Sequence, residues 1–141
     1  MIDIDYFKRI NDKYGHVVGD HILVELSDIL TTSFRKTDII TRFGGEEFAI
    51  ILPETTIGHA TMLAERIRKK IETHQYTKLM GGDALTVSMG ISNYHTPGER
   101  PAHKSDMKLI HSADKALYAA KKEGRNRVCI SVPVTAKQAT P

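Results

Sequence analysis

The stretch DIITRFGGEEFAIILP, residues 38–53, places two glycines and two glutamates between two apolar runs. Both runs are rich in β-branched and aromatic side chains, which favour strands. We therefore predict a β-hairpin over residues 39–52, with a two-residue turn in which Gly44 or Gly45 takes a positive φ. Glu46 and Glu47 would then lie on the rigid tip of this hairpin. Because adjacent carboxylates repel each other, the tip requires a compensating basic side chain or metal ion.

Helical and strand patterns alternate on both sides of the hairpin. Upstream, the patterns predict the end of a strand at residues 1–4, a helix over 6–14 that stops at Gly15, and a second helix capped by Asp20. Downstream, they predict a helix from Thr55 or Thr56 to about Thr73, a half-buried strand over 84–94, a loop over 95–105, a helix from Asp106 to Gly124 and a strand over 126–132. Residues 133–141 are expected to form a disordered tail.

This order of elements is typical of an α/β chain, more specifically an α+β sandwich with helices packed on a central sheet. Without the additional elements it reduces to βαββαβ, the ferredoxin-like arrangement. At 141 residues the chain is long enough for one core and too short for two. We expect one domain over residues 1–132.

The composition is that of an ordinary globular protein, with 40% hydrophobic and 26% charged residues. A formal net charge of +3 weakly favours anionic partners such as nucleotides. Cys129 is the single cysteine, which excludes an internal disulfide and fits a reducing compartment. The sequence shows neither a membrane-spanning run nor a signal peptide, and its histidines lack the spacing of a zinc site.

A second acidic pair, Asp3 and Asp5, lies where the first strand ends and a helix begins. If this strand is next to the hairpin, the two acidic points meet at one edge of the sheet. Carboxylate oxygens with open water positions are what Mg²⁺ uses to hold a triphosphate. The alternative is that DID caps a helix and GGEE is a solvated turn.

Two further features favour an anion site. The backbone N–H groups of the first helical turn, at Tyr6, Phe7 and Lys8, are free to bind a negative charge. Lys121, Lys122 and Arg125 surround the end of a later helix at Gly124. For at least one of these lysines the alternative is a cation that stabilises the helix dipole.

Four segments together resemble the GGDEF family of diguanylate cyclase domains in its GGEEF form: DIDYFKRINDKYGHVVGD (3–20), RFGGEEF (42–48), SMGIS (88–92) and ADKALYAAKKEGRN (113–126). They follow the family's order and extend over most of the chain. The resemblance implies a fold similar to the palm of nucleotidyl cyclases. It also implies that two GTP molecules, one on each domain of a homodimer, condense to cyclic di-GMP with loss of pyrophosphate.

The resemblance assigns the site residue by residue. Asp3, Glu46 and the main-chain oxygen of Ile4 would bind Mg²⁺, with Mn²⁺ as the alternative cofactor. Glu46 is also the family's proposed general base, although a metal-bound carboxylate is a poor base. Glu47 would support the metal site. Asn11, Asp20 and, more weakly, His16 would contact guanine. A carboxylate such as that of Asp20 can accept hydrogen bonds from both the N1–H and the 2-amino group of guanine. The substrate-binding set is completed by Phe7, Lys8, Gly44, Gly45, Lys121 and Arg125.

A product-binding site is implied by RKTD, residues 35–38, which stands at the position of the family's RxxD inhibitory motif. Arg35 and Asp38 would bind cyclic di-GMP, and Arg66 would complete the site across a dimer. R-x-x-D alone is common and is usually a surface ion pair. The resemblance therefore implies product inhibition of an allosteric kind.

The family also carries an upstream half of the first strand and a preceding helix, so we expect this chain to be an N-terminally truncated piece of a longer protein. The resemblance implies that this protein is bacterial and cytoplasmic and that it has a sensory or dimerising module. No membrane contact or nucleic-acid polymer is expected for the domain itself. Two other functions stay open: a catalytically incompetent module that binds cyclic di-GMP, and an RNA-binding domain. The RNA-binding alternative requires exposed aromatic side chains on central strands, and those strands offer almost none.

Overall fold

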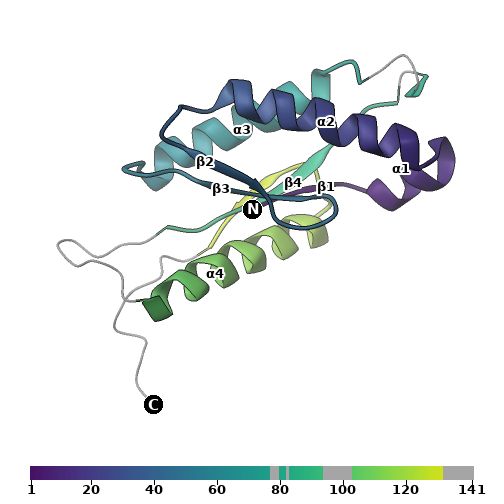
Figure 1. Cartoon of the computed structure of the whole chain (residues 1–141). Helices are drawn as coiled ribbons and strands as arrows, with labels where there is room; N and C mark the ends of the chain where they lie inside the picture. Colours follow the sequence, from purple (N-terminus) through teal and green to yellow (C-terminus); the bar gives the residue numbers. More distant parts are fainter. Residues whose placement is uncertain (77–79, 82, 94–102, 132–141) are drawn as a thin grey trace.

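The computed structural model describes residues 1–76, 80–81, 83–93 and 103–131. Along the chain lie β1 (Ile2–Ile4), α1 (Phe7–Tyr14), α2 (His16–Ser33), β2 (Ile39–Arg42), β3 (Glu47–Ile51), α3 (Ile57–Thr73), β4 (Val87–Ile91), α4 (His103–Lys122) and β5 (Val128–Ile130). The strands form one sheet in the order β2-β3-β1-β4-β5 (Figure 1). Every pair is antiparallel except β4 with β5. The predicted α+β sandwich and its ferredoxin-like core are confirmed, with β1 in the centre.

The hairpin is confirmed, but its predicted turn is wrong. Strands β2 and β3 pair from Ile39 with Ile51 to Arg42 with Phe48, and residues 43–46 connect them. Neither Gly44 nor Gly45 has a positive φ. The longer connection reverses the chain without a left-handed residue, and the guanidinium of Arg42 donates to the carbonyl oxygens of both glycines at 2.6–3.2 Å.

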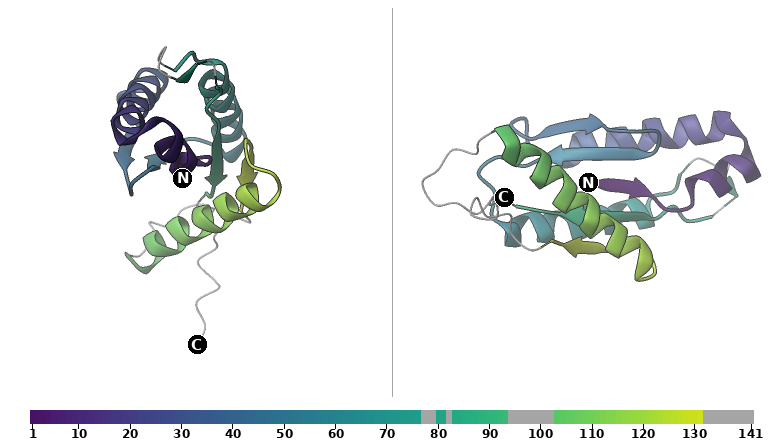
Figure 2. Two further views of the ribbon diagram at one scale, coloured as in Figure 1. Left: turned by 90° about the vertical axis from the view of Figure 1, so that its right-hand side faces the viewer. Right: turned by 90° about the horizontal axis from the view of Figure 1, so that it is seen from below.

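Helices α2 and α3 cover one face of the sheet, and α4 covers the other (Figure 2). The main core lies between the sheet and the α2–α3 layer, where Ile22, Leu26 and Leu30 of α2 are fully buried. The prediction that Asp20 caps α2 is wrong, because that helix already begins at His16. Gly15 has φ 88°, a conformation that lets the chain turn from α1 straight into α2.

Strand β4 is buried on both faces, whereas its alternating pattern predicted a half-buried strand. Val87 and Met89 face the main core, and Ser88 between them is equally inaccessible. The additional cover is α4, which begins at His103, three residues before the predicted start at Asp106. α4 lies so close to β4 that a side chain at Gly90 would collide with its backbone.

Two predictions lie largely outside the described residues. The first is the loop at residues 95–105. Only residues 103–105 of it are described, and they belong to α4 and not to a loop. The second is the tail at residues 133–141. Within the described ranges, no helix has the length and apolar character that crossing a membrane requires.

Candidate functional site

Strand pairing brings the two acidic points of the sequence together. Asp3 of β1 is the register partner of Glu47 of β3. One residue further on, the backbone N–H of Ile4 donates to the carbonyl oxygen of Glu46 at 3.4 Å. The carboxylates of Asp3 in the central strand, Glu46 at the end of the hairpin connection and Glu47 at the start of β3 therefore share one edge.

Asp3 is the electrostatic centre of this cluster. Its side chain is only 8% exposed, and the Nζ atom of Lys121, at the end of α4, lies 2.7 Å from its Oδ2 atom. Burial raises the pKa of Asp3, the ion pair with Lys121 opposes that rise, and the charges of Glu46 and Glu47 add to it. One lysine thus faces three carboxylates.

A divalent cation suits these donors. Among the described residues no set of three acidic, histidine or cysteine side chains is arranged to enclose an ion. The chain would supply the carboxylates of Asp3 and Glu46 as hard oxygen ligands, and Mg²⁺ completes such a small set with water and phosphate oxygens. Burial is the main reason that the pKa of Asp3 is raised, and the charges of Glu46 and Glu47 add to that rise.

Replacing Asp3 by asparagine should separate function from stability. We expect Asp3→Asn to weaken binding of a divalent cation while its melting temperature at pH 7 equals or exceeds that of the wild type. A raised folded-state pKa means that ionised Asp3 costs stability at neutral pH, and that this cost is removed as the pH falls through the folded pKa.

The difference in stability between Asp3→Asn and the wild type should therefore be largest near neutral pH and vanish in acid, where Asp3 is itself uncharged. Urea denaturation at a series of pH values measures it. A variant that is less stable than the wild type at pH 7 would show that the ion pair with Lys121 outweighs burial.

The residues predicted to bind guanine lie where α1 meets α2. The Oδ1 atom of Asn11 is buried and has no hydrogen-bond partner among the described residues. It lies directly against Gly19, where an added Cβ would be 1.9 Å from it. Asp20 follows and is exposed, at a groove of about 410 Å³ that Leu23, Arg42 and Phe48 also line. His16 is exposed at the start of α2.

The N-terminus of α1 is open to an anion. Tyr6 caps the helix in the left-handed region, with φ 57°, and its side chain makes no capping hydrogen bond. In the described part of the chain the backbone N–H groups of Phe7 and Lys8 have no partner, whereas those of Arg9 and Ile10 donate to the carbonyl oxygen of Tyr6. An unsatisfied first turn of this kind binds phosphate readily.

Arg125 approaches the same helix end from the loop after α4. Its guanidinium carbon lies 4.4 Å from the centre of the Tyr6 ring, and its Nη1 atom donates to the Tyr6 hydroxyl at 3.3 Å. The two predicted phosphate ligands therefore have different partners: Lys121 forms an ion pair with Asp3, and Arg125 stacks on the side chain of Tyr6, the residue that precedes α1.

Residues 35–38 form a turn between α2 and β2. The carboxylate of Asp38 accepts from the backbone N–H of Arg35 at 2.8 Å, so the two residues do not form the side-chain ion pair that is usual for this spacing. The Arg35 guanidinium has no partner among the described residues, and Arg66 is likewise exposed on α3. The structure does not place these two arginines in contact.

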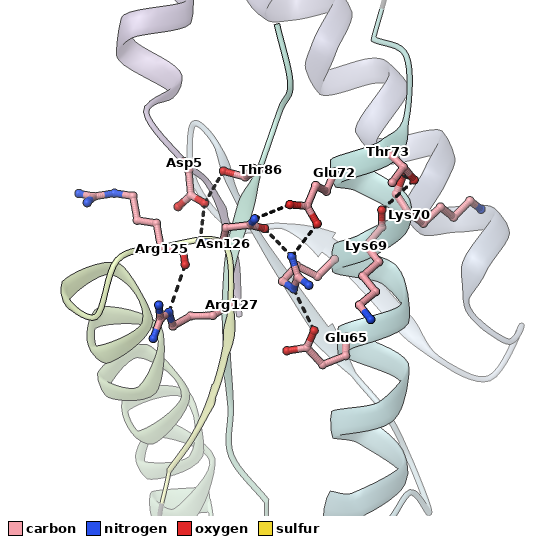
Figure 3. Close-up of polar contacts among 11 residues, drawn as sticks. Asp5, Glu65, Lys69, Lys70, Glu72, Thr73, Thr86, Arg125, Asn126 and Arg127 are labelled. Carbon is pink, nitrogen blue, oxygen red and sulfur yellow. Dashed lines mark hydrogen bonds and ion pairs between the residues drawn. The ribbon is translucent and has the colours of Figure 1, made fainter.

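Asp5 was predicted as one of an acidic pair, but its structural role and its partners Thr86, Ser88 and Asn126 were missed in the sequence. Asp5 is buried and accepts from the hydroxyls of Thr86 and Ser88 at 2.8 and 2.7 Å. It also accepts from the backbone N–H of Asn126 at 3.0 Å, which joins the start of the site to its last loop (Figure 3). The sequence could not indicate this, because it does not show that Asp5 and Ser88 are buried together.

The fold is a palm-like α+β domain, in which carboxylates from a central strand and its neighbouring hairpin lie beside an open helix N-terminus. Residues 1–127 match the family described as "Diguanylate cyclase, GGDEF domain". The chain belongs to this family.

Individual relatives agree with this assignment. The chain is 43% identical over 131 residues to diguanylate cyclase A of Treponema denticola, covering 93% of this chain and 34% of the relative. Among solved structures, it is similar to the active GGEEF domain of a diguanylate cyclase from Vibrio cholerae, with a TM-score of 0.82, 36% identity and coverage of 93% and 80%. It is also similar to the GGDEF domain of DgcB from Caulobacter crescentus in complex with c-di-GMP, with a TM-score of 0.80, 32% identity and coverage of 92% and 74%. The chain thus spans about a third of the length of the Treponema relative.

Proposed function

We propose that this chain is a diguanylate cyclase domain that condenses two GTP molecules to cyclic di-GMP in a homodimer. The ribose 3′-oxygen of each GTP attacks the α-phosphorus of the other, a phosphodiester bond forms, and one pyrophosphate leaves from each GTP. The observation that carries the proposal is the register of β1 with β3, which places Asp3 beside Glu47 and the backbone of Glu46.

The residues divide this work by their chemistry. Mg²⁺ or Mn²⁺, when bound, would neutralise triphosphate charge and polarise the phosphate oxygens. Asp3 and Glu46 would hold the ion, and Glu47 would add to the negative field around it. Phosphoryl transfer depends mainly on positioning and on charge stabilisation, which the amides of Phe7 and Lys8 and the cations of Lys121 and Arg125 would supply.

Guanine recognition would fall to Asn11 and Asp20. The buried Oδ1 atom of Asn11, which has no partner among the described residues, is an acceptor that costs stability until a donor reaches it. An Asp20 carboxylate can accept from both N1–H and the 2-amino group of guanine, a pair of donors that adenine lacks, so ATP would be rejected.

The experiment that tests this function is incubation of the purified chain with GTP and Mg²⁺, followed by chromatographic separation of the products. Cyclic di-GMP and pyrophosphate are expected from GTP, and none from ATP. If GTP is bound but never consumed, the catalytic proposal fails.

A second function is favoured by one specific observation: the Arg35 guanidinium is unpaired among the described residues, while Asp38 is held by the backbone of the same turn. A domain that only binds cyclic di-GMP through Arg35, Asp38 and Arg66 would show calorimetric binding of the product without turnover of GTP. If the chain is catalytic, these residues would instead mediate product inhibition, and Arg35→Ala would relieve it.

The need for two domains gives a kinetic prediction. Because neither domain alone holds both GTP molecules in reacting positions, the rate per mole of chain should rise with chain concentration until the dimer is saturated. A dilution series assayed at constant GTP measures this dependence. A rate per mole that stays constant down to concentrations at which sedimentation shows only monomer would contradict it.

A further inference from the structure

The loop after α4 is held in an unusual backbone conformation. Arg125 and Asn126 both lie in the left-handed region, with φ 65° and 46°. Neither is a glycine, so the conformation carries a backbone cost that surrounding contacts must offset. Asparagine tolerates this region better than most residues do, but arginine does not.

Asn126 is fixed by three hydrogen bonds to two different parts of the molecule (Figure 3). Its Oδ1 atom accepts from Nη1 of Arg68 at 2.6 Å, and its Nδ2 atom donates to Oε1 of Glu72 at 2.7 Å. Its backbone N–H donates to Asp5 at 3.0 Å. One side chain thereby ties the loop to α3, and its backbone ties the same loop to the end of β1.

The α3 side of this clamp is itself rigid. The Arg68 side chain is 11% exposed and forms ion pairs with Glu65 at 2.9 Å and Glu72 at 3.0 Å, one helical turn to either side. These contacts raise the pKa of Arg68 against the effect of its burial, and the hydrogen bonds from Asn126 and Arg68 lower the pKa of Glu72. Every polar group of the Asn126 side chain therefore meets a partner that is already oriented.

We propose that Asn126, clamped by Arg68 and Glu72, is a positioning residue that holds Arg125 in its left-handed conformation and directs the Arg125 guanidinium to the phosphate end of the site. The ring of Tyr6 supports the guanidinium at 4.4 Å but places no constraint on the backbone of Arg125. The backbone of Arg125 is held by two hydrogen bonds of its own, from its N–H to the carbonyl oxygen of Ala120 at 2.9 Å and from Nε of Arg127 to its carbonyl oxygen at 3.2 Å. The clamp adds a third constraint, because it fixes the residue that follows Arg125 to α3 and to Asp5. This inference rests on the proposed function insofar as it names phosphate as the ligand of Arg125.

Two substitutions at Asn126 test the clamp. Asn126→Ala removes the side chain and disfavours a positive φ, whereas Asn126→Gly removes the side chain and permits that φ freely. If the clamp by Arg68 and Glu72 matters, both variants should release Arg125. Lys69→Ala, an exposed neighbour on α3 that does not contact Asn126, is the matched control.

The first measurement needs no ligand. The {¹H}–¹⁵N heteronuclear NOE of the Arg125 Nε–H group should be high in the wild type and in Lys69→Ala, and should fall in both Asn126 variants. Melting curves of the same samples confirm that they are folded. An Arg125 side chain that stays as rigid in folded Asn126→Gly as in the wild type would overturn the proposal.

The second measurement separates positioning from general damage. GTP affinity should fall roughly tenfold in both Asn126 variants, the loss expected when a charge-assisted contact is no longer preorganised. The affinity for guanosine, which has no phosphate, should stay unchanged. Equal losses for GTP and guanosine would show a merely structural role and overturn the inference. If the wild type binds no GTP, the proposed function fails, while the NOE still decides whether Asn126 positions Arg125.

Discussion

Glu46→Ala is expected to abolish formation of cyclic di-GMP, with a fall in rate of at least about 100-fold, the usual scale for losing one electrostatic contributor in a phosphoryl-transfer site. Glu46 lies in the connection between β2 and β3, and its backbone oxygen is tied to Ile4. Removing its carboxylate would leave Asp3, which forms an ion pair with Lys121, as the main hard ligand for the proposed metal ion. Chromatography of GTP incubations measures the loss.

The control for this prediction is Asp28→Ala, which removes an exposed carboxylate from α2 and leaves the acidic cluster intact. It should retain wild-type turnover. Glu46→Ala should also keep the wild-type melting temperature within a few degrees, because the Glu46 side chain makes no hydrogen bond or ion pair among the described residues. Turnover within tenfold of the wild type would remove Glu46 from the catalytic site.

Glu46→Asp separates the two roles that this carboxylate could have. If Glu46 is mainly a metal ligand, the shorter side chain keeps its charge and the variant should recover activity as Mg²⁺ is raised. If Glu46 is mainly a base, excess metal ion should restore nothing, because proton transfer depends on reach. We expect recovery, since a metal-bound carboxylate is a poor base.

The elements of the fold could be predicted because their signals are local. The hairpin follows from two β-branched runs around Gly44 and Gly45, and the start of α3 follows from Thr56, whose hydroxyl accepts from the backbone N–H of His59. The prediction that Asp20 caps α2 was wrong because Gly15 allows the helix to begin at His16. The sequence alone does not distinguish an aspartate at a helix start from one inside a helix.

The contacts between distant residues could not be predicted in the same way. Arg68 and Asn126 are 58 positions apart, and nothing in either segment specifies the other. The sequence pattern likewise predicted that one face of β4 is buried without showing that α4 would cover the second. Lys121 was predicted to contact phosphate, but its ion pair with Asp3 depends on where α4 ends relative to β1.

Gly90→Ala should produce the largest loss of stability. A Cβ atom at Gly90 would lie 2.1 Å from the carbonyl oxygen of Ala113, 2.2 Å from the backbone nitrogen of Leu117 and 2.8 Å from its Cα. All three atoms belong to the α4 backbone, so no side-chain rotation relieves the collision. We expect a loss of about 3 kcal/mol in the free energy of unfolding, at the upper end of what overpacking usually costs.

Gly58→Ala is the matched control, because Gly58 lies in α3 and an added Cβ meets nothing within 4 Å. That variant should be more stable than the wild type by about 0.5–1 kcal/mol, through the higher helix propensity of alanine. Urea denaturation of the three proteins gives both values. A Gly90→Ala protein as stable as the wild type would show that α4 is not seated on β4 as described.

The same substitution links packing to chemistry. To admit a methyl group at Gly90, α4 must move away from the sheet, and Lys121 at its end would move with it from the carboxylate of Asp3. Gly90→Ala should therefore lower GTP turnover even under conditions in which the protein is still folded, whereas Gly58→Ala should leave turnover unchanged. If the folded fraction of Gly90→Ala turned over GTP at the wild-type rate, the position of Lys121 on Asp3 would be irrelevant to catalysis.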